Sequence, residues 1–130
     1  MRKLIRQLVC FSLVTLGVLS FQAQAVTPEH FVVRNTQELI DVCSTPPTDP
    51  LYTAAIHFCH GYLVWAYHYQ ESLFSGPGVK QVVCFTEPKP SRNEGIAKYI
   101  QWAKARPEYA KDRAVDSFSK FLAETWPCKE

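Results

Sequence analysis

Residues 51–73 read LYTAAIHFCHGYLVWAYHYQESL and are the most informative stretch of this chain. Ile56, Cys59 and Leu63 recur at the spacing of one helix face, and the aromatic residues around them make most of the circumference apolar. The pattern predicts one long helix at the buried centre of the domain. Gly61 in mid-helix costs about 1 kcal/mol relative to alanine, which predicts close approach by a neighbouring helix.

Helix breakers bound this segment on both sides. A proline-rich stretch, 46–50, precedes it, and the Ser-Gly-Pro-Gly sequence at 75–78 follows it. Asn35 and Glu38 have the spacing of a capping box, which predicts a shorter helix ending before the prolines. The residues before it, 26–34, are predicted to be extended.

Two further helices are predicted after the Gly-Pro-Gly sequence. Ser91 and Glu94 form a second capping box and start a helix that ends near Arg106. Pro107 suits the first turn of a fourth helix. The apolar stripe of that helix consists of Val115, Phe118, Leu122 and Trp126. The chain is therefore predicted to be all-α, a small four-helix, up-down-like domain.

The first 25 residues have the pattern of a secretory signal peptide. Arg2, Lys3 and Arg6 precede an apolar run of about 14 residues, and Ala-Gln-Ala at 23–25 gives a small-x-small ending. We therefore expect a mature domain, 26–130, located in the periplasm.

Charge and length exclude several classes of function. The 130 residues, one domain at most, include 14 Lys+Arg and 12 Asp+Glu, but three of the cations belong to the signal segment. The mature domain is then slightly negative and has no cationic cluster that would favour nucleic acid. No second apolar span follows, so we expect no membrane association after signal cleavage.

Four cysteines remain once the signal segment is removed. They are Cys43, Cys59, Cys84 and Cys128. An even number in an exported chain predicts two disulfides. In an up-down arrangement the preferred pairs are 43–59 and 84–128, although three connectivities are possible and the sequence does not decide among them.

The sequence predicts no metal site, no cofactor and no enzyme. His57 and His60 lie three residues apart and could share a metal, but no third ligand stands at a fixed spacing from them. The chain also lacks a Gly-rich phosphate loop, a G-x-S-x-G elbow and an H-E-x-x-H motif.

Two features instead favour binding to a partner. The aromatic residues of the central helix are too many to point into one small core, so Tyr62, Trp65 and Tyr69 are candidates for a partner or self-association face. A crowded core is the alternative. The second feature is a candidate partner-binding loop, which is either a plain connector or a protruding contact. This loop consists of Ser75, Gly76, Pro77, Gly78, Val79 and Lys80.

Six short motifs follow one another along the mature chain. They are Leu39-x-x-x-Cys43, Asp49-Pro50-Leu51-Tyr52, Phe58-Cys59-x-Gly61-Tyr62, Val83-Cys84, Arg106-Pro107-Glu108 and Trp126-Pro127-Cys128. As an ordered set after a signal sequence, they resemble the Rap/Tai immunity family of type VI secretion. The resemblance implies a helical periplasmic protein that binds a peptidoglycan amidase toxin and blocks its active-site cleft. It further implies homodimers, a protruding loop that plugs the toxin and four structural cysteines.

The main alternative is a periplasmic acid-activated stress chaperone, which would also be exported, helical and disulfide-linked. Such proteins expose apolar surface when acid protonates their carboxylates. Here the carboxylates are few and matched by cations, and two disulfides would oppose opening. Another exported helical binding protein is the third possibility.

Overall fold

The computed structural model describes residues 25–129, so the predicted signal segment lies, except for Ala25, outside the described residues. The elements are η1 (Pro28–Val32), α1 (Thr36–Cys43), α2 (Tyr52–Leu73), α3 (Arg92–Lys104), η2 (Pro107–Tyr109) and α4 (Ala114–Thr125). The predicted all-α fold with four helices and two disulfides is confirmed. In the described part of the chain, β pairing is limited to one isolated bridge between Val83 and Pro127.

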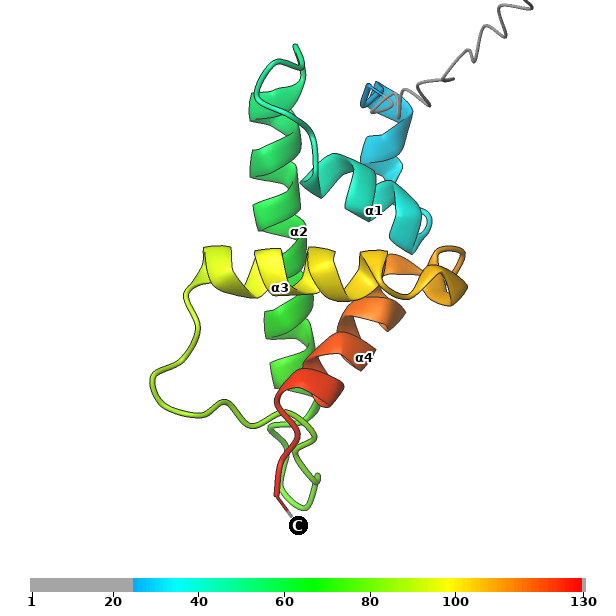
Figure 1. The fold of residues 1–130 in the computed structure, drawn as a ribbon. Coiled ribbons are helices and arrows are strands. Elements are labelled where there is room, and N and C mark those ends of the chain that lie inside the picture. Colours follow the sequence, from blue (N-terminus) through cyan, green and yellow to red (C-terminus); the bar gives the residue numbers. More distant parts are fainter. Residues whose placement is uncertain (1–24, 130) are drawn as a thin grey trace, which may run out of the picture.

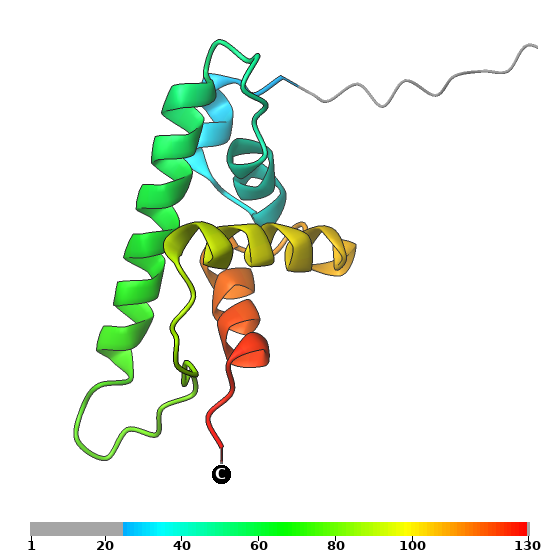
Figure 2. The ribbon, with the colours of Figure 1, turned by 60° about the vertical axis from the view of Figure 1, so that its left-hand side comes forward.

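Helix α2 runs along the whole molecule, and the other helices pack on it (Figure 1). Helix α1 lies beside the first part of α2, whereas α3 crosses it near the middle (Figures 1 and 2). Helix α4 packs on both α2 and α3. The loop that follows α2 and the C-terminus lie at the same end of the molecule (Figure 1).

The core lies where all four helices meet, and Tyr99 of α3 is at its centre. This side chain is fully buried, with Phe118 and Phe121 of α4 packed edge-on at ring distances of 5.2 and 5.5 Å. Its hydroxyl is within 2.9 Å of Ser117 Oγ, which also accepts a hydrogen bond of 2.8 Å from Thr36 Oγ1 in α1. The buried polar groups are therefore paired with one another, as burial requires. Burial raises the pKa of Tyr99 to about 12.

The preferred disulfide pairing is confirmed, and the two bonds have different surroundings. Cys43 at the end of α1 is bonded to Cys59 of α2, and both residues are buried. Cys84 in the α2–α3 loop is bonded to Cys128, and Cys84 is exposed. The backbone N–H of Cys84 also donates to the Trp126 carbonyl at 2.8 Å. The loop is thus fixed to the C-terminal segment by covalent and hydrogen bonds.

The fourth helix begins later than its proline predicts. Pro107 opens the short 3₁₀ element η2, and α4 starts only at Ala114. The carbonyl of Asp112 accepts from the N–H of Thr36 at 2.9 Å. Helix α1 therefore uses a backbone acceptor of this intervening segment to satisfy its own N-terminal donors.

Two further expectations were wrong. The segment expected to be extended contains the 3₁₀ element Pro28–Val32, which has Pro28 in its first turn and a Thr27–His30 capping box. No neighbouring helix approaches Gly61, because a Cβ atom placed there would have no heavy atom within 4 Å. Gly61 is exposed, so close packing does not explain its presence in α2.

Candidate interaction surface

One flank of α2 carries a continuous row of aromatic residues with two different environments. Phe58, Tyr62, Trp65 and Tyr69 share this flank because of their helical spacing. Near the start of the helix, η1 covers the row, since the Phe31 ring meets Phe58 edge-on at 5.4 Å. Beyond Tyr62, the row is open to solvent. The expectation that α2 is buried nearly all round is therefore wrong, because its neighbours cover only part of this flank.

The structure separates the three aromatic candidates into a half-buried residue and an exposed pair. Tyr62 stacks on Phe58 at 6.1 Å, and burial, with a smaller effect of the Asp116 charge, raises its pKa. Trp65 is 59% exposed and Tyr69 48% exposed, and their rings stack on each other at 5.3 Å. Trp65 and Tyr69 thus present a preformed aromatic pair to solvent.

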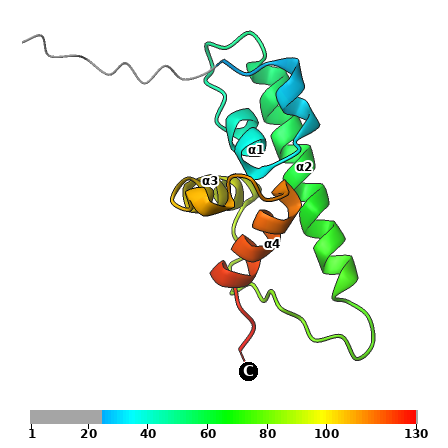
Figure 3. The same ribbon diagram turned by 90° about the vertical axis from the view of Figure 1, so that its right-hand side faces the viewer.

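The candidate loop, 75–80, extends this surface beyond the end of α2. It lies away from the helices at one end of the molecule (Figures 2 and 3). A turn in which the Val79 N–H donates to the Gly76 carbonyl at 3.1 Å shapes it, and Gly78 has a positive φ of 77° that suits glycine. Exposed large apolar side chains also occur at the end of α2 and on this loop. Together with the aromatic pair they form what we call the apolar strip: Trp65, Tyr69, Leu73 and Val79.

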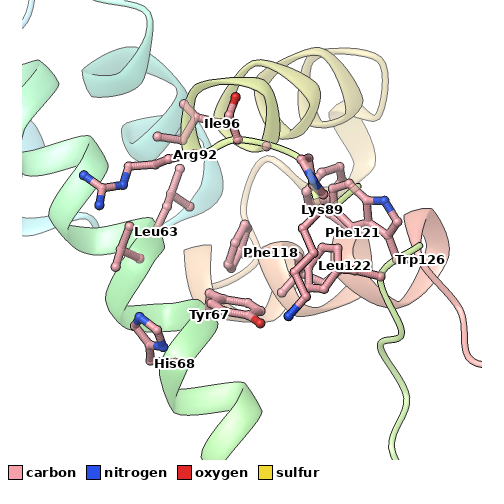
Figure 4. Close-up of a pocket in the computed structure, with 15 residues that line it drawn as sticks. Leu63, Tyr67, His68, Lys89, Arg92, Ile96, Phe118, Phe121, Leu122 and Trp126 are labelled. Atoms are coloured by element: carbon pink, nitrogen blue, oxygen red, sulfur yellow. The ribbon is translucent and has the colours of Figure 1, made fainter. Parts of the chain in front are cut away.

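A cleft of about 260 Å³ lies on another side of α2, between α2, α3, α4 and the end of the loop (Figure 4). We call it the aromatic cleft. Phe85 closes one side, with its ring 5.6 Å from Tyr67 and 4.8 Å from Trp126. The Tyr67 hydroxyl donates to Glu71 at 3.0 Å, and burial together with this hydrogen bond raises the pKa of Tyr67. The apolar lining of the aromatic cleft also includes Leu63, Ile96, Phe118, Phe121 and Leu122.

Sequence reasoning missed the aromatic cleft. Its walls come from segments far apart in the chain, such as Leu63, Phe85 and Phe121. The sequence held one signal, since the prolines at 88 and 90 stiffen the link that brings Lys89 to the cleft. Nothing in that signal indicates which surface the link would approach.

The histidines of α2 form no metal centre in the described part of the chain. Among residues 25–129, no three His, Cys, Asp or Glu side chains are grouped so that they could hold a metal ion. His57 is exposed, and His68 lies 3.4 Å from the Glu71 carboxylate.

Within the same described range, no helix combines the length and apolar character needed to cross a membrane.

Comparison with known protein families identifies the family of this chain. The family model described as Rap1a immunity proteins matches residues 35–128, which include all four helices and all four disulfide cysteines. No curated protein and no solved structure matches this chain.

Proposed function

Because the chain belongs to the family of Rap1a immunity proteins, we propose that it acts in the periplasm by binding and inhibiting a peptidoglycan amidase toxin delivered by type VI secretion. Membership in an immunity family implies a toxin-binding, non-enzymatic inhibitor. The amidase class and the compartment are the finer parts of the proposal. The observation that supports it most directly is the apolar strip, which joins an exposed aromatic pair to a protruding loop.

The apolar strip has the composition of a protein-binding surface. Tryptophan and tyrosine are enriched among residues whose truncation weakens protein complexes most. Stacking of Trp65 on Tyr69 already restricts both rings in the free protein, which lowers the entropy lost on binding. The loop 75–80 is the part we assign to the toxin cleft, because it lies away from the helices. The aromatic pair would contact the toxin surface beside it.

Export is supported by two independent features of the chain. The first 25 residues have the pattern of a signal peptide. All four remaining cysteines are in disulfides, which persist in oxidising compartments such as the periplasm. Intact-mass measurement on protein recovered from the periplasm should give a chain that begins at Val26. Recovery of the full-length chain from the cytoplasm alone would contradict the location.

The binding experiment uses the oxidised protein purified from cells that express the full chain. It is immobilised and exposed to lysates of strains that carry type VI toxins, and bound proteins are identified by mass spectrometry. We expect one stoichiometric cell-wall hydrolase whose release of peptide from purified peptidoglycan stops on binding. Capture of many unrelated periplasmic proteins, only at acid pH, would support the chaperone instead.

Surface variants then locate the contact. We expect Trp65→Ala combined with Tyr69→Ala to weaken inhibition by about 100-fold, since two such residues commonly contribute a few kcal/mol. Val32→Ser is the matched control, because Val32 is also an exposed apolar residue but lies on η1. Equal inhibition by all three proteins would exclude the aromatic pair from the toxin contact.

The same variants test whether the protein forms homodimers. Sedimentation velocity of the parent protein and of the double variant measures the oligomeric state directly. A dimer that dissociates in the double variant, with inhibition unchanged, would assign the aromatic pair to self-association and leave the toxin contact to the loop.

A further inference from the structure

We propose that the aromatic cleft is a second docking site, which binds an acidic segment of a partner protein and takes one large apolar side chain of that segment. This site lies on a different side of α2 from the apolar strip. The proposal does not depend on the identity of any toxin.

The size and lining of the cleft fit a single large side chain. Its volume of about 260 Å³ is just below the ~300–1,000 Å³ typical of clefts that hold drug-sized ligands. Rings of Tyr67, Phe85 and Trp126 line it, so an aromatic or branched aliphatic group would find apolar contacts on several sides. Gly95 of α3 also lines it, and open space surrounds the position of a Cβ atom there.

The charges around the cleft favour an anionic occupant. Lys89 and Arg92 both line it, and in the described residues neither has an ion pair with a carboxylate (Figure 4). Two acidic side chains on helices that line the cleft have hydrogen-bond partners of their own. Glu71 accepts from Tyr67 and lies near His68, whereas Glu94 accepts two hydrogen bonds of 2.7 Å from Ser91. Two cations that form no ion pair within residues 25–129 therefore border an apolar cavity.

A neighbouring cleft supplies a polar group that also lacks a partner. This second cleft, of about 290 Å³, shares Tyr67, Phe85 and Lys89 with the aromatic cleft. It is also lined by Gln70, which is only 6% exposed and whose Oε1 accepts no hydrogen bond from the described residues. A buried acceptor without a donor is unfavourable. Because this oxygen is itself buried, a backbone N–H of a peptide that continues from the aromatic cleft reaches it only if the Gln70 side chain turns toward the second cleft.

These features favour a peptide over a lipid as the occupant. A fatty acid offers one carboxylate, whereas Lys89 and Arg92 lie on different sides of the cleft (Figure 4), so a peptide with an acidic residue on each side of its apolar residue can pair with both. An acidic peptide with one large apolar residue therefore matches both the cavity and the two cations.

The test uses a defined probe and an assigned reporter. The probe is the acetylated, amidated peptide Gly-Glu-Phe-Asp-Gly-Gly, titrated into the full oxidised protein. The reporter is the indole N–H signal of Trp126, identified in NMR spectra by its loss in Trp126→Phe. We expect saturable shifts of this signal and of backbone amides in 85–96, with a Kd below ~5 mM. Affinity should fall as salt increases.

Two variants, each with a matched control, test the cavity and the charges separately. Gly95→Leu places a side chain at the cleft wall and should abolish the shifts, whereas Gly61→Leu, the same change at an exposed α2 position, should leave them intact. Lys89→Glu with Arg92→Glu should weaken binding about tenfold. Lys104→Glu with Lys111→Glu has the same net charge and should bind as the parent protein does.

Several outcomes would overturn the proposal. They are absence of saturable shifts, equal binding of Gly-Lys-Phe-Lys-Gly-Gly or Gly-Glu-Ala-Asp-Gly-Gly, and tighter binding of dodecanoate at the same signals. Equal loss of binding in the matched control variants would also overturn it. Circular dichroism spectra of all variants identify any that fail to fold.

Discussion

The two halves of α2 carry the same kind of sequence but have opposite environments. Phe58 and Tyr62 lie on the same helix flank as Trp65 and Tyr69, and all four are aromatic. Phe58 is packed against Phe31 of η1, whereas the later pair is exposed to solvent. The first half is also bonded to α1 through a buried disulfide, and the second half leads into the loop. An aromatic row is therefore core or interaction surface according to what covers it.

The largest expected difference is between the rates at which the two disulfides are reduced. One bond holds the first half of α2, and the other holds the loop that follows the second half. Cys84 is exposed, whereas Cys59 is 0% exposed, so a reductant reaches the 43–59 bond only in unfolded molecules. For a domain stable by ~5 kcal/mol or more, that requirement slows reduction at least about a thousandfold. Limited reduction with dithiothreitol, alkylation and peptide mass spectrometry should find Cys84 and Cys128 labelled first. Simultaneous labelling of all four cysteines would contradict a difference in protection.

Truncation of one aromatic residue in each half compares their packing directly. We expect Phe58→Ala to lower the free energy of unfolding by about 2 kcal/mol, because a half-buried ring loses its contacts with Phe31 and Tyr62. Tyr69→Ala should change it by less than about 0.5 kcal/mol, since surface substitutions are nearly neutral. Urea titration measures both. A large loss in Tyr69→Ala would show that the aromatic pair stabilises the fold itself.

Ionisation of Tyr99 at alkaline pH tests the stability of the core, against which the first half of α2 packs. The pKa of Tyr99 is about 12 in the folded protein and about 10 in an unfolded chain. Its contribution to stability is therefore complete below pH 10 and is lost as pH rises through 12. Between pH 9 and pH 11 the loss is about 1 kcal/mol. Urea titrations at both pH values should show this loss in the parent protein and a smaller one in Tyr99→Phe.

The last expected loss of stability is at the start of α3, where the loop from the exposed half joins the core. Ser91→Ala removes the side chain that accepts from the Glu94 N–H, and should lower the free energy of unfolding by about 1 kcal/mol.

The capping box of Ser91 and Glu94 also predicts how stability changes at acid pH. Hydrogen bonds from Ser91 lower the pKa of Glu94. The stabilisation from its carboxylate is therefore present above the ordinary carboxyl pKa and is lost as pH falls through the lowered value. In thermal melts between pH 7 and pH 3, the melting temperatures of the parent protein and of Ser91→Ala should become more similar as pH falls. A constant difference would mean that the Ser91 hydroxyl does not stabilise the Glu94 carboxylate.

Much of the fold could be predicted from residues close together in the chain. Asn35 accepts from the Glu38 N–H at 2.9 Å, and Ser91 and Glu94 form the predicted capping box. The breakers ended α1 and α2 as expected. Such features depend on neighbours three or four residues away, so the sequence contains them directly. Pro107 misled the prediction of α4, because a contact with distant Thr36 occupies the intervening backbone.

The candidate surfaces were predictable only in part. The excess of aromatic residues on α2 indicated that some are exposed, but the spacing alone could not distinguish Tyr62 from Trp65. That distinction depends on how far η1 extends along the flank, and Phe31 is far from α2 in the chain. The aromatic cleft depends in the same way on distant segments, which bring Lys89 and Arg92 beside rings of α2 and α4.

By itself, the amino-acid sequence determined four helices, their caps and breakers, the even number of cysteines in residues 26–130 and the resemblance to an immunity family. Each of these depends on local spacing or on residue identity, which the chain carries irrespective of its fold. Tertiary structure alone decided which aromatic residues are covered and where Lys89 and Arg92 meet an apolar cavity. Those properties arise from contacts between residues far apart in the chain, which exist only after the helices have packed.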